Sequence, residues 1–298
     1  MRPHFTSPVD SLDRSDCETL IKLALLEDAP NGDPTSEGIF SKEQMCTASV
    51  ISREPGVMCG ASLTGCLTSI FFELTGMQVN VLLSLKDGDR FEKGSVLMKL
   101  SGSIPAMLRL ERILLNFLQY LSGIATVTAN CVAQAPAGVF ILDTRKTLPG
   151  YRRLAKYAVF MGGGTNHRIH LSEMAMMKDN HIAAAGGIAS AARNIRARFP
   201  GLPVEIEVDR IEQIEEALGE NPKVILLDNM NGGRIREAIK VIRAYCDRTG
   251  TKPPIIEVSG GWTPARLPEL AGLDLPVGVS MGFLTHTTRF LDLSLEIA

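Results

Sequence analysis

Charged and polar side chains follow six short apolar runs in the second half of the chain, at the points where these runs end. The runs are VFILD (139–143), MAMMKD (174–179), VEIEVD (204–209), VILLDN (224–229), IIEVSG (255–260) and VGVSMG (277–282). In and after these run ends stand Asp143, Arg145, Lys146, Lys178, Asp179, Asn180, His181, Glu207, Asp209, Asp228, Asn229, Ser259, Gly260, Gly261, Ser280 and Gly282. Arginine binds carboxylate or phosphate through planar paired contacts, and lysine acts as a point charge. Aspartate and glutamate are hard oxygen ligands for magnesium and stabilise developing positive charge. This order of charges predicts a site for a substrate with several negative charges together with a divalent cation.

Two glycine-containing turns late in the chain are candidates for binding phosphate. Ser259-Gly260-Gly261 is followed by Thr263 and Pro264, which have the types of a helix cap and a first helical residue. Unpaired N–H groups at such a helix start point outward and attract anions. In βα barrels the loops after the last two strands often form the phosphate site. We therefore predict phosphate binding at Ser259–Gly261, with Gly282 as its neighbour.

The segment GGGTNHR (162–168) has three interpretations: a phosphate cradle, a hinge, or a mount for His167 and Arg168. It lacks the GK[ST] of a P-loop and the third glycine of the dinucleotide fingerprint. His167, His170 and His181 raise the alternative of a transition-metal site. That alternative is disfavoured because the glutamate of the HExxH motif is absent.

These six runs also predict the fold that positions the charged residues. They are short and apolar without strict alternation, which is typical of strands buried on both faces, and amphipathic stretches separate them. The alternation favours a parallel α/β barrel, in which the reacting groups meet at the carboxyl ends of the strands. A full barrel needs about eight strands, so either two strands are hidden or the barrel is incomplete.

The first part of the chain has a different pattern. We expect a helix over residues 16–27, a strand at TASVISR (47–53) and a helix over residues 61–74. A DG turn between the apolar runs of residues 79–102 predicts a hairpin. Residues 104–133 predict one or two helices, with Ser122-Gly123 as a potential break. The final LDLSLEIA (291–298) is predicted to be a strand that returns to this first domain.

The composition limits the classes of function. The chain has 298 residues and a formal net charge of -2, so no global basic field attracts nucleic acid or membranes. Its six cysteines form no CxxC pair, which favours free thiols in a reducing compartment. The first residues lack the apolar core of a signal peptide, and no apolar stretch is long enough to span a bilayer. We expect a cytoplasmic protein.

A long central motif is similar to the signature of the quinolinate phosphoribosyltransferases, the carboxylating nicotinate-nucleotide pyrophosphorylases. The motif is DTRKTLPGYRRLAKYAVFMGGGTNHR (143–168), followed by MKDNHI (177–182). Shorter matches follow the same order along the whole chain: LLEDAPNGDPTS, LERILLNFLQYLSGIAT, EIEVD, LLDNM, EVSGG and SMGFLTH. The resemblance implies that quinolinate attacks 5-phosphoribosyl-1-pyrophosphate through its ring nitrogen. Diphosphate leaves with magnesium, and loss of carbon dioxide gives nicotinate mononucleotide, a step of NAD synthesis. No organic cofactor is implied.

The resemblance also implies an architecture and an assembly. The fold would be an N-terminal α/β sandwich over residues 1–117, to which residues 284–298 return, beside an open, incomplete α/β barrel over residues 118–283. Members of the family form dimers or higher assemblies of dimers, in which the partner subunit supplies an arginine to each site. Here that arginine would be Arg112.

The family's functional residues map onto matching positions of this sequence. The resemblance implies that quinolinate is held by Arg145, His167, Arg168 and Lys178, with Arg112 from the partner. Lys146 would approach the phosphoribosyl diphosphate, and Glu207 and Asp228 would lie near the ribose and its magnesium. The 5-phosphate would be held by Ser259, Gly260, Gly261 and Gly282. On this basis we expect the glycines of the GGGTNHR loop to let the backbone turn tightly after a helix, so that His167 and Arg168 face a dicarboxylate.

Two positions depart from the family pattern. His170 stands where the motif has glycine, and Tyr120 stands where a basic residue is common. A sister family linked to molybdenum transport shares much of the pattern, but KDNH at residues 178–181 favours the quinolinate enzymes. An inert metabolite-binding protein is a further alternative. Glu207 and Asp228 argue against it, because a pure anion binder has no use for carboxylates there.

Overall fold

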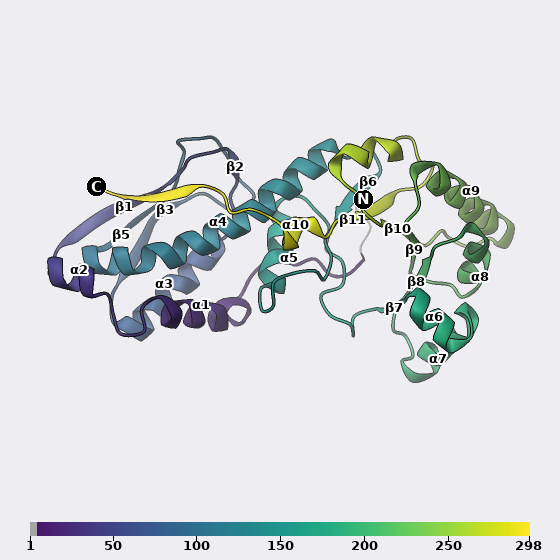
Figure 1. Cartoon of the computed structure of the whole chain (residues 1–298), viewed down its shortest axis with the longest axis horizontal. Helices are drawn as coiled ribbons and strands as arrows, with labels where there is room; N and C mark the ends of the chain where they lie inside the picture. Colours follow the sequence, from purple (N-terminus) through teal and green to yellow (C-terminus); the bar gives the residue numbers. More distant parts are fainter. Residues whose placement is uncertain (1–4) are drawn as a thin grey trace. The chain divides into compact units, whose positions relative to one another are not determined.

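The computed structural model describes residues 5–298 and divides into two compact units. The first, here called the parallel unit, comprises Cys131–Lys146, Gly164–Gly282 and the segment that ends at Pro8. The second, called the antiparallel unit, comprises Val9–Asn130, Thr147–Gly163 and Phe283–Ala298. Figure 1 shows the chain coloured along its sequence. Each unit is built around its own sheet.

The parallel unit contains the six strands that the sequence predicts. They are β6 (Val139–Leu142), β7 (Ala175–Met177), β8 (Val204–Val208), β9 (Val224–Asp228), β10 (Ile255–Ser259) and β11 (Val277–Ser280). The sheet order is β6-β11-β10-β9-β8-β7, and every neighbouring pair is parallel. Strands β6 and β7 are its two ends and do not pair with each other, so the barrel is open. Outside β6, Thr165 forms one parallel bridge with Leu142. This open sheet confirms the incomplete barrel.

Helices follow the strands of the parallel unit (Figure 1). They are α6 (Asp179–Ala185), α7 (Ile188–Arg198), α8 (Ile214–Gly219) after the 3-10 turn η1 (Ile211–Gln213), α9 (Gly232–Thr249) and the 3-10 helix η2 (Pro264–Leu270). The sequence of α9 shows which residues start, orient and end a helix of this unit. The side chain of Asn231 caps its first turn, and Ile235, Ile239 and Ile242 recur on one buried face. Gly250, in the left-handed conformation, ends the helix.

The antiparallel unit has a four-stranded sheet in the order β12-β1-β5-β3. Its strands are β1 (Met45–Ser52), β3 (Val79–Ser84), β5 (Val96–Ser103) and β12 (Leu293–Ile297), and a separate ribbon pairs β2 (Gly56–Val57) with β4 (Arg90–Phe91). The other elements of this unit include α1 (Arg14–Asp28), α2 (Pro34–Ile39), α3 (Ala61–Thr75), α5 (Arg152–Met161) and α10 (Phe283–His286). The C-terminal strand pairs with β1, which confirms its predicted return.

The predicted hairpin over residues 79–102 is only partly right. Strands β3 and β5 pair antiparallel, as expected. The DG turn does not join them directly, because the chain first pairs β4 with β2 before it enters β5. Gly88, with φ of +92°, turns the chain within this longer connection.

Helix α4 (Ile104–Gln134) is continuous, so the potential break at Ser122-Gly123 is absent. These two small residues instead admit neighbouring segments. A Cβ on Gly123 would lie 2.3 Å from the carbonyl oxygen of Arg289. The Ser122 hydroxyl donates to the carbonyl of Cys59 at 3.2 Å and accepts its N–H at 3.0 Å. The expected domain boundary after residue 117 falls inside this helix, and the compact units divide after Asn130 instead.

Candidate active site

Lys178, Glu207 and Asp228 gather at the carboxyl ends of three neighbouring strands, β7, β8 and β9. The ammonium of Lys178 lies 3.7 Å from Oε2 of Glu207. Burial raises the pKa of Glu207, the Lys178 ammonium opposes that rise, and the charge of Asp228 adds to it. Two carboxylates therefore act on each other beside one cation, as the sequence predicts.

The donor set of Glu207 and Asp228 fits a hard divalent cation. Both side chains offer carboxylate oxygens, which magnesium prefers. Burial raises the pKa of Glu207 and the charge of Asp228 adds to that rise, and a cation between the two carboxylates would offset their repulsion. Asp228 is held in place by the side-chain amide of Asn229, which donates to its Oδ2 at 2.6 Å.

Arg145 and Arg168 form a second charged group in the same unit. The Arg168 side chain is buried, and its guanidinium donates to the carbonyl oxygen of Met174 at 2.6 Å and to the sulfur of Met176 at 3.6 Å. Burial and the positive charge of Arg145 lower the pKa of Arg168. The buried Nε of Arg145 has no hydrogen-bond partner among residues 5–298. Two guanidinium groups that repel each other in this way are suited to share an anion.

The GGGTNHR loop is attached to the edge of the sheet. Gly163 has φ of +86°, and a Cβ on Gly162 would lie 2.4 Å from the carbonyl oxygen of Ala125, so both glycines are required where α5 ends. Thr165 then runs beside β6 as an additional one-residue bridge. These contacts confirm that the glycines turn the chain tightly after the helix.

Asp143 anchors the rest of this loop. The buried carboxylate accepts the backbone N–H of His167 at 2.8 Å and the side-chain amide of Asn166 at 2.7 Å. Strand β6 ends just before Asp143, so a single carboxylate connects the strand end to His167, which the family resemblance assigns to the substrate.

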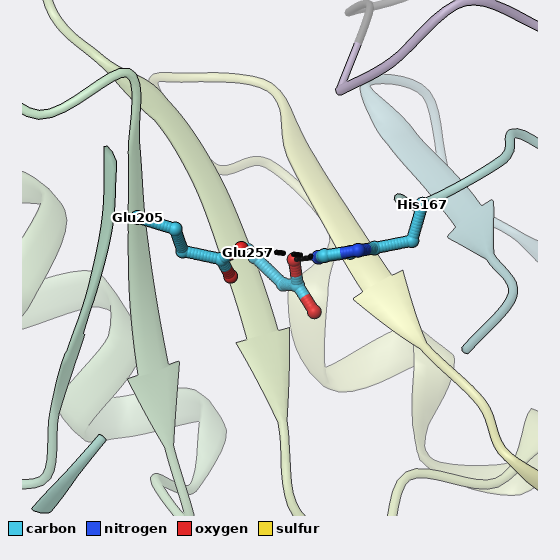
Figure 2. Close-up of side chains that lie close together, drawn as sticks. All are labelled: His167, Glu205 and Glu257. Carbon is cyan, nitrogen blue, oxygen red and sulfur yellow. Dashed lines mark ion pairs between the residues drawn. The ribbon is translucent and has the colours of Figure 1, made fainter. Parts of the chain in front are cut away.

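Figure 2 shows that His167 points toward two glutamates, Glu205 on β8 and Glu257 on β10. Its Nε2 lies 2.8 Å from Oε2 of Glu257 and 3.2 Å from Oε2 of Glu205, and all three side chains are buried. The hydroxyl of Ser280 donates to the other oxygen of Glu257. Burial lowers the pKa of His167, but the charges of Glu257 and Glu205 outweigh it and raise that pKa to about 10.

A backbone hydrogen bond lies at the opposite edge of the ring. The backbone N–H of Arg168 donates to Nδ1 of His167 at 2.8 Å. Nε2 therefore faces the two carboxylates, and Nδ1 faces a backbone donor. Both ring nitrogens have partners within the chain, and a dicarboxylate would reach them only if these contacts changed.

The Ser259–Gly261 turn follows β10 and lies against Asn229 at the end of β9. Gly260 and Gly261 have φ of +100° and +63°. A Cβ on Gly260 would lie 2.3 Å from Oδ1 of Asn229, and the Asn229 N–H donates to the Ser259 carbonyl at 3.1 Å. Thr263 and Pro264 stand at the predicted cap and first helical positions, but the helix they start is the short 3-10 helix η2, and the Thr263 side chain makes no capping bond.

Two further predicted residues lie at the surface. Lys146 is exposed in the parallel unit, and Arg112 is exposed on α4 in the antiparallel unit. The histidines do not form the alternative metal site, since His170 pairs with Ser172 at 2.7 Å and His181 accepts the N–H of Lys178 at 3.1 Å. Within residues 5–298, the only three-residue His, Cys, Asp or Glu group with metal-ligand spacing is His167, Glu205 and Glu257.

Sequence reasoning missed Glu205 and Glu257, although a signal for both was present. Each carboxylate interrupts an apolar strand, in VEIEV and IIEVS. An ionisable residue in the middle of a buried parallel strand must have a partner in the interior. Glu205 and Glu207 are two residues apart and therefore share a strand face.

Comparison with known proteins identifies the family of the chain. The model of the quinolinate phosphoribosyl transferase N-terminal domain matches residues 33–122, and that of its C-terminal domain matches residues 124–296. The chain belongs to the quinolinate phosphoribosyltransferase family. The match confirms the resemblance seen in the sequence.

Individual members of the quinolinate phosphoribosyltransferase family are similar over nearly the whole chain. The nicotinate-nucleotide pyrophosphorylase [carboxylating] of Mycobacterium leprae is 38% identical, covering 95% of this chain and 99% of its own. The probable enzyme of that name from Bacillus subtilis is 39% identical, covering 93% and 92%. The structure of NadC from Streptococcus pyogenes aligns with a TM-score of 0.87 at 35% identity, covering 97% of this chain and 98% of its own. The nicotinate-nucleotide pyrophosphorylase of Francisella tularensis aligns with a TM-score of 0.87 at 30% identity, covering 98% and 100%.

Proposed function

We propose that the chain transfers the phosphoribosyl group of 5-phosphoribosyl-1-pyrophosphate to quinolinate and releases diphosphate and carbon dioxide, giving nicotinate mononucleotide for NAD synthesis. Family membership over both domains supports this activity. The observation that carries the proposal is the group formed by Lys178, Glu207 and Asp228 at the carboxyl edge of the open sheet. Such a cation-and-carboxylate group suits a reaction between an anionic acceptor and a ribosyl donor.

For quinolinate we propose the cations Arg145, Arg168 and Lys178 as ligands. The first two are guanidinium groups whose mutual repulsion a carboxylate would relieve. Fixing both carboxylates of the acid orients its ring nitrogen for attack on the anomeric carbon. Arg112 of a second copy is proposed to complete this group. Its exposure on α4 makes it available to a partner.

For the ribosyl donor we propose Glu207 and Asp228 near the anomeric carbon and Lys146 near the diphosphate. The transition state has the character of an oxocarbenium ion, so carboxylates beside the ribose stabilise its positive charge. Glu207 and Asp228 would also hold magnesium, directly or through water, and bound magnesium would neutralise charge on the diphosphate. Ser259, Gly260, Gly261 and Gly282 are proposed to hold the 5-phosphate through backbone N–H groups, which the two positive-φ glycines leave uncovered by side chains.

We further propose a cytoplasmic homodimer. The six cysteines are free thiols, which suits a reducing compartment. None of the helices over residues 5–298 has the length and apolarity needed to cross a bilayer.

A single assay tests the proposed activity. Purified protein is incubated with quinolinate, 5-phosphoribosyl-1-pyrophosphate and magnesium, and nicotinate mononucleotide and carbon dioxide are quantified. We expect both products in equal amounts and none without magnesium. Turnover of nicotinate with no turnover of quinolinate would refute the substrate assignment. Absence of turnover with any pyridine acid would favour the inert binding protein.

A further inference from the structure

A series of buried polar contacts crosses the interior of the open sheet. The Ser280 hydroxyl on β11 donates to one carboxylate oxygen of Glu257 on β10, and the other oxygen lies 2.8 Å from Nε2 of His167. At the other side of the ring, Nδ1 accepts the backbone N–H of Arg168. His167 follows Thr165, which lies outside β6 at the open end of the sheet. These side-chain contacts therefore connect the open end of the sheet, next to β6, to its central strands (Figure 2).

His167, Glu205 and Glu257 have the residue types of a metal site, and the contact made by Nδ1 of His167 decides between the two interpretations. A histidine that binds a metal through Nε2 donates a proton from Nδ1 to a neighbouring acceptor. Here Nδ1 faces a donor, the Arg168 N–H, and Nε2 lies at ion-pair distance from Glu257. These contacts favour pairing of the ring with the Glu257 carboxylate over metal binding.

Three contacts leave the His167 ring little freedom. Nε2 is held by Glu257 at 2.8 Å, the ring of Phe5 lies at a centroid distance of 5.7 Å, and the backbone N–H of His167 is held by Asp143. The ring in turn holds the N–H of Arg168. The direction in which Arg168 leaves the backbone thus depends on where the ring sits.

We propose that Glu257 is a positioning residue, which fixes His167 across the open barrel and thereby places the Arg168 guanidinium for the acidic substrate. This inference rests on the proposed function for its substrate, quinolinate. Glu257 itself is buried and touches no substrate in this role. The requirement is for an oxygen atom of residue 257 at the right distance from β10 to contact Nε2 of His167.

Two substitutions of Glu257 separate reach from charge. In Glu257→Gln the amide oxygen can still accept the Nε2 proton, and the amide NH₂ can donate to the Ser280 hydroxyl. In Glu257→Asp the charge stays, but the carboxylate withdraws by one methylene. We expect E257Q to keep KM for quinolinate within about threefold of the wild type. E257D should raise it about tenfold to a hundredfold, because small misplacement of a binding group has effects of that size. KM for 5-phosphoribosyl-1-pyrophosphate should change by less than about threefold in both variants.

Glu205→Asp is the matched control, since it shortens the neighbouring carboxylate, which lies farther from Nε2 at 3.2 Å. We expect a smaller rise in KM for quinolinate than in E257D. A double variant, H167L with E257D, should be no worse than H167L alone, because both act through one contact. Additive losses would show that His167 and Glu257 act separately and would overturn the proposal. Impaired E257Q together with normal E257D would show that charge matters and would overturn it as well.

A spectroscopic measurement keeps the inference independent of turnover. In ¹⁵N-histidine-labelled protein, E257D should shift the His167 ring nitrogen signals relative to the wild type, because Nε2 loses its partner at 2.8 Å. Ring nitrogen signals that are unchanged in E257D would overturn the proposal. If E257D shifts these signals but the wild type does not use quinolinate, the proposed function fails and the positioning of His167 stands.

Discussion

The carboxylate of Asp143 accepts the backbone N–H of His167 at 2.8 Å, across a separation of 24 residues. Its second oxygen accepts the Asn166 amide at 2.7 Å. One buried side chain thus ties two consecutive residues of the GGGTNHR loop to the end of β6. The position of the loop is set by the strand end rather than by its three glycines, which only permit the turn.

Exchanging these two side chains tests that anchor. In Asp143→Asn, one amide nitrogen must face a donor, either the His167 N–H or the Asn166 amide. We expect the free energy of unfolding to fall by about 1–3 kcal/mol, the cost of a buried unsatisfied group. In the double variant D143N with N166D, the amide of residue 143 can donate to the new carboxylate, so part of the loss should be recovered. Denaturant unfolding of the four proteins measures this. Additive losses would contradict the anchor.

Adjacent glycines in the predicted phosphate turn should respond differently to alanine. Gly260→Ala places a Cβ 2.3 Å from Oδ1 and 2.8 Å from Cα of Asn229, at a φ of +100°. Gly261→Ala meets no atom within 4 Å, although its φ of +63° is also left-handed. We expect G261A to cost about 1–2 kcal/mol of stability, the ordinary cost of that conformation. G260A should cost more and should raise KM for 5-phosphoribosyl-1-pyrophosphate. Equal effects would show that contact with Asn229 is unimportant.

The pairing of Glu54 with Arg289 gives a prediction for acid stability. The Glu54 carboxylate accepts hydrogen bonds from the Arg289 guanidinium and from the backbone N–H of Asp292. Arg289 lowers the pKa of Glu54, although partial burial opposes this shift. Because the pKa of Glu54 is lowered in the folded state, the pair stabilises the fold above the ordinary glutamate pKa of about 4.5, and this stabilisation is lost as the pH falls. The advantage of wild type over E54Q should be about 1 kcal/mol or less at pH 7, because Arg289 is largely exposed. This advantage should be lost as the pH falls through the lowered pKa of Glu54 in the folded protein. Unfolding curves from pH 2.5 to 7 measure it.

The strands and their polar ends could be predicted from the sequence, because buried parallel strands are short apolar runs and the chain alternates them with amphipathic helices. The interior glutamates could not be placed in the same way. Glu257 pairs with His167, which is 90 positions earlier, and no local pattern connects them. The predicted helix break at Ser122-Gly123 was wrong for a similar reason. The prediction considered only local sequence, whereas Gly123 leaves room for the carbonyl of Arg289, which is far away in the sequence.

Tyr120 shows the same limit for a departure from the family pattern. Its hydroxyl donates to the Thr285 carbonyl at 2.9 Å, and its ring packs edge-on against Tyr151 at 5.8 Å. The side chain is buried, and burial raises the pKa of its hydroxyl. In this chain the position therefore serves packing within the antiparallel unit. The sequence alone shows only that a basic residue is replaced.

Substitutions of Arg168 should affect the binding of the two substrates differently. Its guanidinium is held by the Met174 carbonyl, and its pKa is lowered by burial and by Arg145. In Arg168→Lys the charge stays but the planar fork is lost, so we expect KM for quinolinate to rise about tenfold or more while that for 5-phosphoribosyl-1-pyrophosphate changes little. Arg168→Ala should abolish detectable quinolinate binding in titration calorimetry and largely spare the phosphoribosyl donor. Arg193→Ala, on α7 away from the strand ends, is the control for loss of a surface charge. Equal loss of both substrates in R168A, with a lowered unfolding temperature, would show that Arg168 acts by holding the Met174 loop rather than by binding the acid.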